Sequence, residues 1–307
     1  MAIDPQPVSR SAVTQVNTAD EAGVRPCSEH GGFEDYDSVA TTYDHTRQPV
    51  GVELHLGFFT RVGRPLTELT ILDAGCGTGS YAAAVAPRVG RIIGLDLSRG
   101  MLAVCKRKLA RFAGAAALQG AITDIPLPDR HVDGVMLNQV IHHLPPGGGF
   151  AALKQVFAEA ARVLRPHGVF VVHTTSRQQL MRSYWWAHFI PKAVARLGER
   201  LPVEHTCDGV LESMGREAGL RPRGVVVPVD CILQGNAYLN AKGPFRKEYR
   251  DGDSTWTLAT EPELDRALQE LHAMIDDNTI QEHLDRAEES RETFGQCVFV
   301  WFQRVGH

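Results

Sequence analysis

The stretch LTILDAGCGTGS, residues 69–80, decides the fold of this chain. It begins as a short apolar run, which is typical of a buried strand, and it continues past three glycines into an alanine-rich segment of helical character. Glycine has no Cβ, so it permits the positive φ of a tight turn and lets a ligand lie directly on the backbone. The stretch therefore predicts a strand, a ligand-binding turn and a helix in succession.

The same order of strand and helix repeats further along the chain. Segment 91–98 is a second apolar run, and Ser98 is placed to cap the helix 99–112 that follows it. Further strands are expected at 115–122, 131–140, 169–176, 223–233 and 296–305, with an amphipathic helix at 150–164. Strands that alternate with helices form a parallel sheet buried on both faces. The predicted fold class is α/β, with a doubly wound, seven-stranded, mostly parallel (Rossmann-like) sheet.

The remaining segments suggest a leader and a helical cap. Residues 1–32 are polar and lack a hydrophobic period, so a flexible leader is expected there, whereas 33–307 are expected to form one domain. Helical insertions at 33–60, 177–222 and 234–295 are expected to form the cap and to meet the substrate, the last of them with a helical stretch from 261 to 292. Pro228 indicates that the strand at 223–233 lies at a sheet edge or contains a bulge.

The composition limits the classes of partner. A net charge of −4 and a pI near 6.4 provide no long-range attraction for nucleic acid, which is therefore not expected as a partner. Lys106, Arg107, Lys108 and Arg111 lie close together, a spacing that suits the solvated face of a helix. The cysteines form no CxxC pair, and no apolar stretch has the length of a membrane span. We therefore expect no metal site, no membrane partner and a cytoplasmic location, with a monomer or homodimer as the assembly.

The glycine-rich turn has a specific pattern, Asp73-x-Gly75-x-Gly77-x-Gly79. It differs from the GxGxxG turn that binds dinucleotides and from the phosphate-binding P-loop. It resembles the first motif of the class I S-adenosylmethionine-dependent methyltransferases, and Asp96 then stands where an acid can accept hydrogen bonds from both hydroxyls of a ribose. The resemblance covers residues 36–176 and implies that S-adenosyl-L-methionine is the cofactor.

The resemblance also implies the remaining contacts with the cofactor. Cys76 belongs to the glycine turn, and Asn138 and Gln139 are expected beneath the cofactor at the end of the fourth strand. Asp124 and Ile125 follow the third strand, where the family places an acid near the adenine amino group and an apolar residue against the ring. The other wall of the adenine site is assigned to Leu97 and Met101. The contact with the methionine carboxylate is assigned to Tyr43 or Arg47, and a purely structural contact between helix and sheet is the alternative for these two residues.

The reaction itself requires few catalytic groups. Methyl transfer from a sulfonium mainly requires that two reactants be held in line and that water be excluded. A hydroxyl acceptor benefits from a base, and His143 is the candidate because it follows the fourth strand, although packing of the His142–His143 pair is an alternative. O-methylation of a small-molecule acceptor is the leading hypothesis. N- or C-methylation of a small molecule, methylation of a macromolecule, and cofactor binding without transfer are the alternatives.

An aromatic cluster follows the fifth strand and consists of Tyr184, Trp185, Trp186 and Phe189. Two adjacent tryptophans on one α-helix cannot both face inward, so at least one of them is expected to meet a pocket or a partner. Packing alone is the alternative. His173, inside the fifth strand, is expected to be a packed residue.

Overall fold

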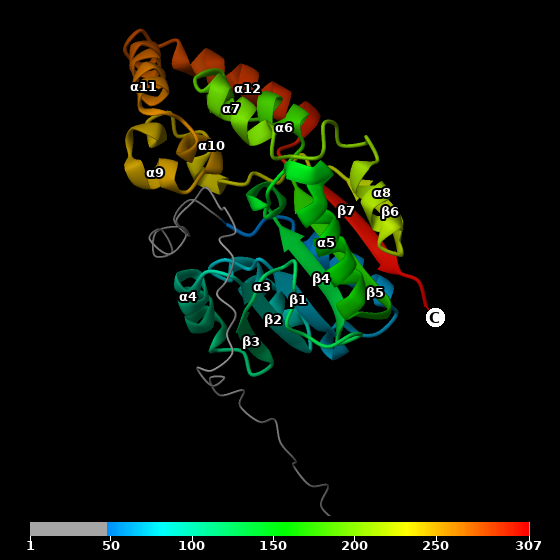
Figure 1. Ribbon diagram of the computed structural model, residues 1–307. Coiled ribbons are helices and arrows are strands. Elements are labelled where there is room, and N and C mark those ends of the chain that lie inside the picture. Colours follow the sequence, from blue (N-terminus) through cyan, green and yellow to red (C-terminus); the bar gives the residue numbers. More distant parts are fainter. Residues whose placement is uncertain (1–47, 307) are drawn as a thin grey trace, which may run out of the picture. The chain divides into compact units, whose positions relative to one another are not determined.

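A seven-stranded sheet in the order β3-β2-β1-β4-β5-β7-β6 forms the centre of the computed structural model, which describes residues 48–306 (Figure 1). The strands are β1 (Thr70–Ala74), β2 (Arg91–Asp96), β3 (Ala115–Gln119), β4 (Val132–Asn138), β5 (Leu164–Thr174), β6 (Leu220–Val226) and β7 (Val298–Arg304). Strands β1 to β5 pair in parallel, and β7 runs antiparallel to both β5 and β6. The mostly parallel, Rossmann-like sheet predicted from the sequence is therefore confirmed.

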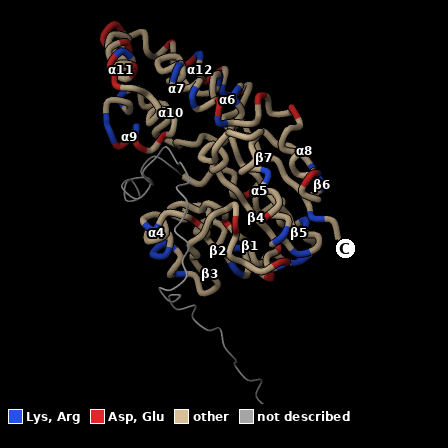
Figure 2. The backbone as a smooth tube through the Cα atoms, viewed as in Figure 1, with Lys and Arg blue, Asp and Glu red and all other residues tan. Residues whose placement is uncertain are grey.

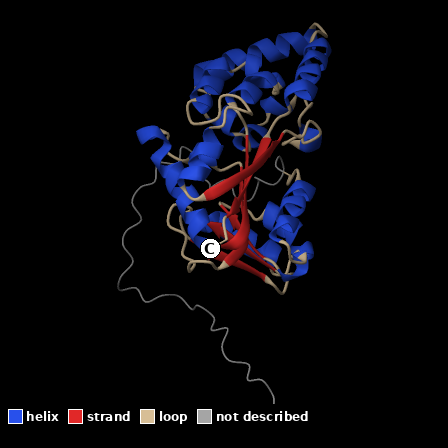
Figure 3. Ribbon diagram, turned by 90° about the vertical axis from the view of Figure 1, so that its right-hand side faces the viewer, coloured by secondary structure: helices blue, strands red, loops and turns tan. Residues whose placement is uncertain are grey.

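Helices cover the sheet on both sides, as Figure 3 shows. They are α2 (Val52–Phe59), α3 (Ser80–Val85), α4 (Arg99–Leu109), α5 (Gly147–Val163), α6 (Arg177–Arg182), α7 (Pro191–Gly198), α8 (Val210–Glu217), α9 (Lys247–Asp251), α10 (Ser254–Thr257), α11 (Glu261–Asp276) and α12 (Ile280–Phe294). Two short 3-10 helices also matter for the site, η5 (Ile141–His143) and η6 (Trp185–His188).

Neighbouring residues of the central strands face two separate hydrophobic clusters. Ile71 packs with α2, α3 and α4 on one face, whereas Leu72 packs with α5 and α8 on the other. Phe59 and Phe157 are fully buried on these two faces, and each such side chain contributes roughly 1.5–3 kcal/mol of burial free energy. Continuous apolar strands are therefore required, because both faces of the sheet are covered.

Some element boundaries differ from the sequence prediction. Strand β5 begins at Leu164 rather than at 169, because Leu164 already pairs with Val132 of β4, before a shift in the register. Strand β6 is an edge strand, as predicted, but it ends at Val226 and its irregularity lies at Pro222, so Pro228 is outside it. The helical stretch predicted from 261 to 292 is present, but it is divided into α11 and α12 at Asn278, whose φ of 61° interrupts a helix.

A group of helices lies beyond the carboxyl ends of β4 and β5 and is called the helical cap below (Figure 1). It comprises α6, η6, α7 and α9 to α12. Trp185 and Trp186 are both buried in it, which agrees with the interpretation that the cluster serves packing alone. They lie on a 3-10 turn rather than an α-helix, and Tyr238 packs beside both: its carbonyl accepts the Trp185 Nε1 hydrogen, and its ring centroid is 5.5 Å from that of Trp186.

Buried polar groups attach the cap to the sheet. The side chain of Gln296, just before β7, accepts a hydrogen bond from the Leu233 amide at 2.9 Å and donates one to the Ser183 carbonyl at 3.1 Å. The backbone carbonyl of Gln296 accepts hydrogen bonds from Thr175 Oγ1 and Tyr184 OH. A buried network in which each member has a partner specifies one geometry, so the cap is fixed against the sheet.

No helix within residues 48–306 is long and apolar enough to cross a membrane. Figure 2 shows acidic and basic residues mixed along α11 and α12, whereas α4 carries mainly basic residues.

Candidate cofactor and active site

The glycine turn joins β1 to α3 and crosses the end of β2. Its three glycines have left-handed backbone, which residues other than glycine rarely adopt. The φ values are 73° at Gly75, 52° at Gly77 and 79° at Gly79. The amides of Gly75 and Cys76 both donate to the Leu95 carbonyl, at 2.8 and 2.9 Å. The turn is thus held on the carboxyl edge of the sheet, where ligands of open α/β folds bind.

The three glycines have different surroundings. A Cβ on Gly75 would lie 2.7 Å from a methyl group of Val140, and one on Gly79 would lie 2.6 Å from the thiol of Cys105. Around Gly77, by contrast, no atom of the described residues lies within 4 Å of an added Cβ. Packing beneath the turn explains Gly75 and Gly79, whereas Gly77 leaves bare backbone next to open space, which suits a cofactor lying on the turn.

Asp96 places a negative charge beside this bare backbone. One of its carboxylate oxygens accepts the Gly77 amide at 2.7 Å, and the other accepts the Ser98 amide at 2.9 Å. Each oxygen has further lone pairs, so the carboxylate can still accept hydrogen bonds from ribose hydroxyls. The Ser98 side chain accepts the Met101 amide at 3.0 Å, which confirms that Ser98 caps α4 and that Asp96 is not needed for this role.

Asp73 lies deeper, at the end of β1, and is 1% exposed. Asn138 Nδ2 donates to one of its oxygens at 3.2 Å, and the other oxygen has no hydrogen-bond partner among residues 48–306. Burial raises the pKa of Asp73 to about 7, and the hydrogen bond from Asn138 only partly offsets this effect. A buried carboxyl group with a spare oxygen fits the ammonium group of an S-adenosylmethionine molecule.

The other predicted cofactor residues follow β2, β3 and β4 in the sequence. Met101 and Ile125 are buried, whereas Leu97 is 41% exposed and Asp124 is exposed. Gln139 directly follows β4 with a strained φ of 52°, and its side-chain nitrogen is buried without a partner in the described part of the chain. Tyr43 and Arg47 lie outside the described residues.

Lys108 corrects one prediction. Its ammonium group donates to Thr78 Oγ1 at 3.0 Å and to Ser80 Oγ at 2.8 Å, so it holds the far side of the glycine turn instead of lying on a solvated face. Lys106, Arg107 and Arg111 are exposed as expected. Residue 108 is three positions after the buried Cys105, so the helical period could have placed Lys108 on the same face of α4.

The candidate base lies on η5, immediately after β4. His143 is half-buried, and its ring centroid is 4.0 Å from that of the buried His142. His142 Nε2 is 3.3 Å from Ser254 Oγ, so the cap element α10 meets the turn that carries His143. Ser254 could not be identified from the sequence, because a contact across 112 residues leaves no local signal.

His173 is a packed residue, as predicted. Its ring stacks on Phe299 with centroids 4.2 Å apart, and its Nδ1 lies 3.3 Å from the hydroxyl of Tyr81. Burial holds the pKa of His173 well below its usual range, and the nearby His55 adds to this effect. The imidazole is therefore neutral at physiological pH and contributes packing rather than charge.

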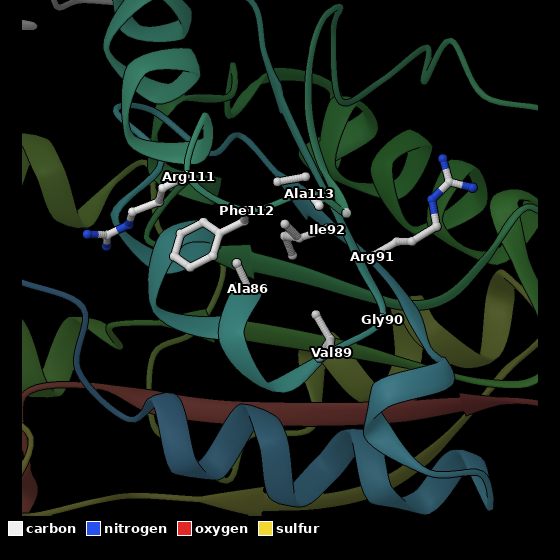
Figure 4. A pocket seen from close by; sticks show the side chains of 10 residues that line it. Ala86, Val89, Gly90, Arg91, Ile92, Arg111, Phe112 and Ala113 are labelled. Carbon is white, nitrogen blue, oxygen red and sulfur yellow. The ribbon is translucent and has the colours of Figure 1, made fainter. Parts of the chain in front are cut away.

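A separate shallow pocket lies at the opposite, amino-terminal ends of β2 and β3 (Figure 4). The guanidinium carbon of Arg111 lies 4.8 Å from the ring centroid of Phe112 beside it. No residue of the glycine turn or of η5 contributes to this pocket, so it is not a candidate for the reaction site. Its lining consists of Ala86, Val89, Gly90, Arg91, Ile92, Arg111, Phe112, Ala113, Gly114 and Ala115.

Comparison with known proteins agrees with this geometry. A family model described as a methyltransferase domain matches residues 72–172. A demethylmenaquinone methyltransferase from Symbiobacterium thermophilum is 30% identical over 204 residues, which are 61% of this chain and 72% of that protein. This chain belongs to the class I S-adenosylmethionine-dependent methyltransferases. A second relative is an S-adenosylmethionine-dependent methyltransferase from Mycolicibacterium smegmatis. It is 36% identical to this chain over 123 residues, which are 40% of this chain and 44% of that protein.

The fold of the methyltransferase is shared with solved structures. A methyltransferase from an antibiotic biosynthesis pathway of Anabaena variabilis superposes with a TM-score of 0.66 and 21% identity, over 84% of this chain and 99% of that one. At this identity the likeness concerns the fold alone. The S-adenosylmethionine-dependent methyltransferase activity follows from the family, and the acceptor has to be argued from the site.

Proposed function

We propose that this methyltransferase transfers the methyl group of S-adenosyl-L-methionine to an oxygen of a small-molecule acceptor. The observation that carries the proposal is the 3.3 Å contact between His142 Nε2 and Ser254 Oγ, which brings the cap onto the turn that holds His143. A folded protein or a duplex would have to reach this turn past α10, so the contact favours a small acceptor that α10 and the turn can enclose. The relative from Symbiobacterium is also named for a small molecule, demethylmenaquinone.

The carboxyl edge of the sheet would hold the cofactor. Asp96 would accept hydrogen bonds from the ribose, Asp73 would face the ammonium group, and Gly77 with Gly75, Cys76 and Gly79 would form the floor. When bound, S-adenosyl-L-methionine supplies a methyl group on a positively charged sulfur. The remaining assignments are Leu97, Met101, Asp124 and Ile125 around the adenine, Asn138 and Gln139 beneath the cofactor, and Tyr43 and Arg47 at its carboxylate.

His143 would act on the acceptor. As the new bond between the acceptor oxygen and the methyl carbon forms and the bond between carbon and sulfur breaks, the imidazole takes the hydroxyl proton. The residues before α2 in segment 33–60, together with 177–222 and 234–295, would surround the acceptor and exclude water. N- or C-methylation is the second candidate, because a neutral amine or an acidic carbon needs less help from a base.

An assay of S-adenosylhomocysteine release tests this proposal. The protein is given methyl-¹³C-labelled cofactor together with either the small-molecule fraction or the macromolecular fraction of a lysate. Release with the small-molecule fraction, and a labelled methyl carbon with the chemical shift of an ether or ester, are expected. Release with only the macromolecular fraction would overturn the substrate class, and a methyl shift typical of nitrogen or carbon would overturn O-methylation. Cofactor binding without any release would indicate a binding protein.

A further inference from the structure

The segment after β3 is an extended strap, Asp124–Asp129, that has few hydrogen-bond donors of its own. Its sequence is Asp-Ile-Pro-Leu-Pro-Asp, and the two prolines at 126 and 128 have no amide hydrogen. A residue before a proline is also biased towards extended backbone, so neither a helix nor a strand ladder can form here. Within the strap the Leu127 amide donates to the Ile125 carbonyl at 2.7 Å, and the other partners of the Ile125 and Leu127 carbonyls come from elsewhere in the fold.

Arg162, near the end of α5, supplies those partners. Its Nη2 donates to the Ile125 carbonyl at 2.8 Å and its Nη1 to the Leu127 carbonyl at 2.8 Å. Nη1 also donates to the Asp129 carboxylate at 2.9 Å. The side chain thus contacts the strap at its start, middle and end.

Glu159, one turn earlier on α5, completes the arrangement and is 8% exposed. Its two oxygens accept from Arg162 Nε and Nη2, both at 2.8 Å, and one of them also accepts the Ile125 amide at 2.7 Å. All five N–H donors of the guanidinium group are then used, in the fixed fork geometry that only arginine has. The opposite side of the strap packs closely against Gly120, because a Cβ added to that glycine would lie 2.8 Å from the ring of Pro126.

We propose that Arg162 is the positioning residue of the adenine site: its guanidinium fork holds the strap so that Asp124 and Ile125 can receive the adenine ring. The inference rests on the proposed cofactor site, because it assigns the adenine to this strap. Arg162 itself lies behind the strap and acts on the cofactor only through it. The expected result of its loss is therefore weaker recognition of the adenine amino group, not a general loss of cofactor binding.

Calorimetry with two ligands can separate these outcomes. S-adenosylhomocysteine carries the adenine amino group, whereas S-inosylhomocysteine has an oxygen in its place and a hydrogen on the adjacent ring nitrogen N1. The wild-type protein should prefer the first by about tenfold, the size of one good hydrogen bond. Arg162→Lys keeps the positive charge but has only three donors, so it should lose about this factor for S-adenosylhomocysteine and little for S-inosylhomocysteine.

Lys154→Met is the matched control, because Lys154 lies on the same helix but pairs with Glu217 at the surface, at 3.0 Å. It should leave both affinities unchanged. Equal weakening of both ligands in Arg162→Lys, or a lower unfolding temperature with unchanged preference, would overturn the positioning role. If the wild type binds both ligands equally, the adenine assignment of the strap is wrong.

Two further results keep the inference and the proposed function distinguishable. A wild-type protein that binds neither ligand would overturn the proposed function itself. If Arg162→Lys does not fold, Asp129→Ala removes one exposed acceptor of the same fork and should reduce the preference in the same direction by a smaller factor. An Asp129→Ala protein with the full wild-type preference would then count against the proposal.

Discussion

In the glycine turn, Gly77 donates its amide to Asp96, a partner 19 residues away, whereas in the cap Gln296 donates to the carbonyl of Ser183, 113 residues away. The glycine turn is built from left-handed backbone conformations that glycine adopts readily, and its contact with Asp96 spans few residues. The cap is built from buried aromatic and amide side chains whose partners lie far along the chain, such as Trp185 with Tyr238. Substitutions at the glycine turn and Asp96 should therefore change mainly the affinity for the cofactor. Substitutions in the cap should change mainly the free energy of unfolding.

The largest expected effect concerns Asp96, at the cofactor edge. Asp96→Ala should weaken S-adenosylhomocysteine binding by roughly 3–6 kcal/mol, because two charge-assisted hydrogen bonds to the ribose are lost. Calorimetry measures this change. Ser98→Ala is the control, since it removes the cap of α4 next to the same carboxylate and should leave the affinity nearly unchanged. An unaltered dissociation constant in a folded Asp96→Ala protein would reject the ribose assignment.

The next effect concerns His143, where the cofactor edge meets the cap. His143→Gln keeps a polar side chain but cannot accept the hydroxyl proton, so kcat should fall by at least about 10²-fold. S-adenosylhomocysteine affinity should change little, because the base acts only in the transition state. Steady-state kinetics and calorimetry together check both expectations. Near-normal turnover would reject the base and favour an amine or an acidic acceptor.

Gln296 tests the cap side of the comparison. Gln296→Met leaves the Leu233 amide buried without a partner, whereas the Ser183 carbonyl keeps the hydrogen bond from Tyr238 OH at 2.9 Å, so the free energy of unfolding should fall by about 1–3 kcal/mol. Urea unfolding measures this, and S-adenosylhomocysteine affinity well below the transition should stay at the wild-type value. Gln303→Met on β7 is the control, because its side chain bonds only to surface carbonyls. A large loss of cofactor affinity in Gln296→Met would show that the two regions are not separable.

The smallest effect is a pH dependence that arises from Asp73. Its carboxyl group, with a pKa of about 7, must lose a proton before it can pair with the cofactor ammonium, so affinity should rise with pH up to about 7 and then level off. The change should approach about tenfold per pH unit below this pKa. In the folded apo-protein the Asp73 carboxyl group keeps its proton up to a pH of about 7, whereas in the unfolded chain it loses the proton near its ordinary pKa of 3.8. The stability of the apo-protein should therefore fall as the pH rises between these two values.

Calorimetry of S-adenosylhomocysteine binding at several pH values checks this prediction. Asp73→Asn should remove the pH dependence, and 5′-methylthioadenosine, which lacks the ammonium group, should not show it in the wild type. The same pH dependence in Asp73→Asn would assign it to another group.

Much of the fold and of the cofactor edge could be predicted from the sequence. The glycine turn requires left-handed backbone at Gly75, Gly77 and Gly79, and only glycine adopts it readily, so the residue type itself records the conformation. The apolar strands alternate with helices, and this period is enough to predict a doubly wound parallel sheet. Asp96 follows from its place at the end of β2.

The tertiary structure decided the rest, because long-range contacts leave no mark on local sequence. Trp185 and Trp186 are both buried, since the cap surrounds a 3-10 turn whose geometry the α-helical period does not predict. Lys108 lies at the glycine turn, and Ser254 lies beside His142, only because α4 and α10 pack where they do. The sequence by itself determined the left-handed backbone of the glycine turn, and packing between distant segments decided which side chains gather around it and around η5.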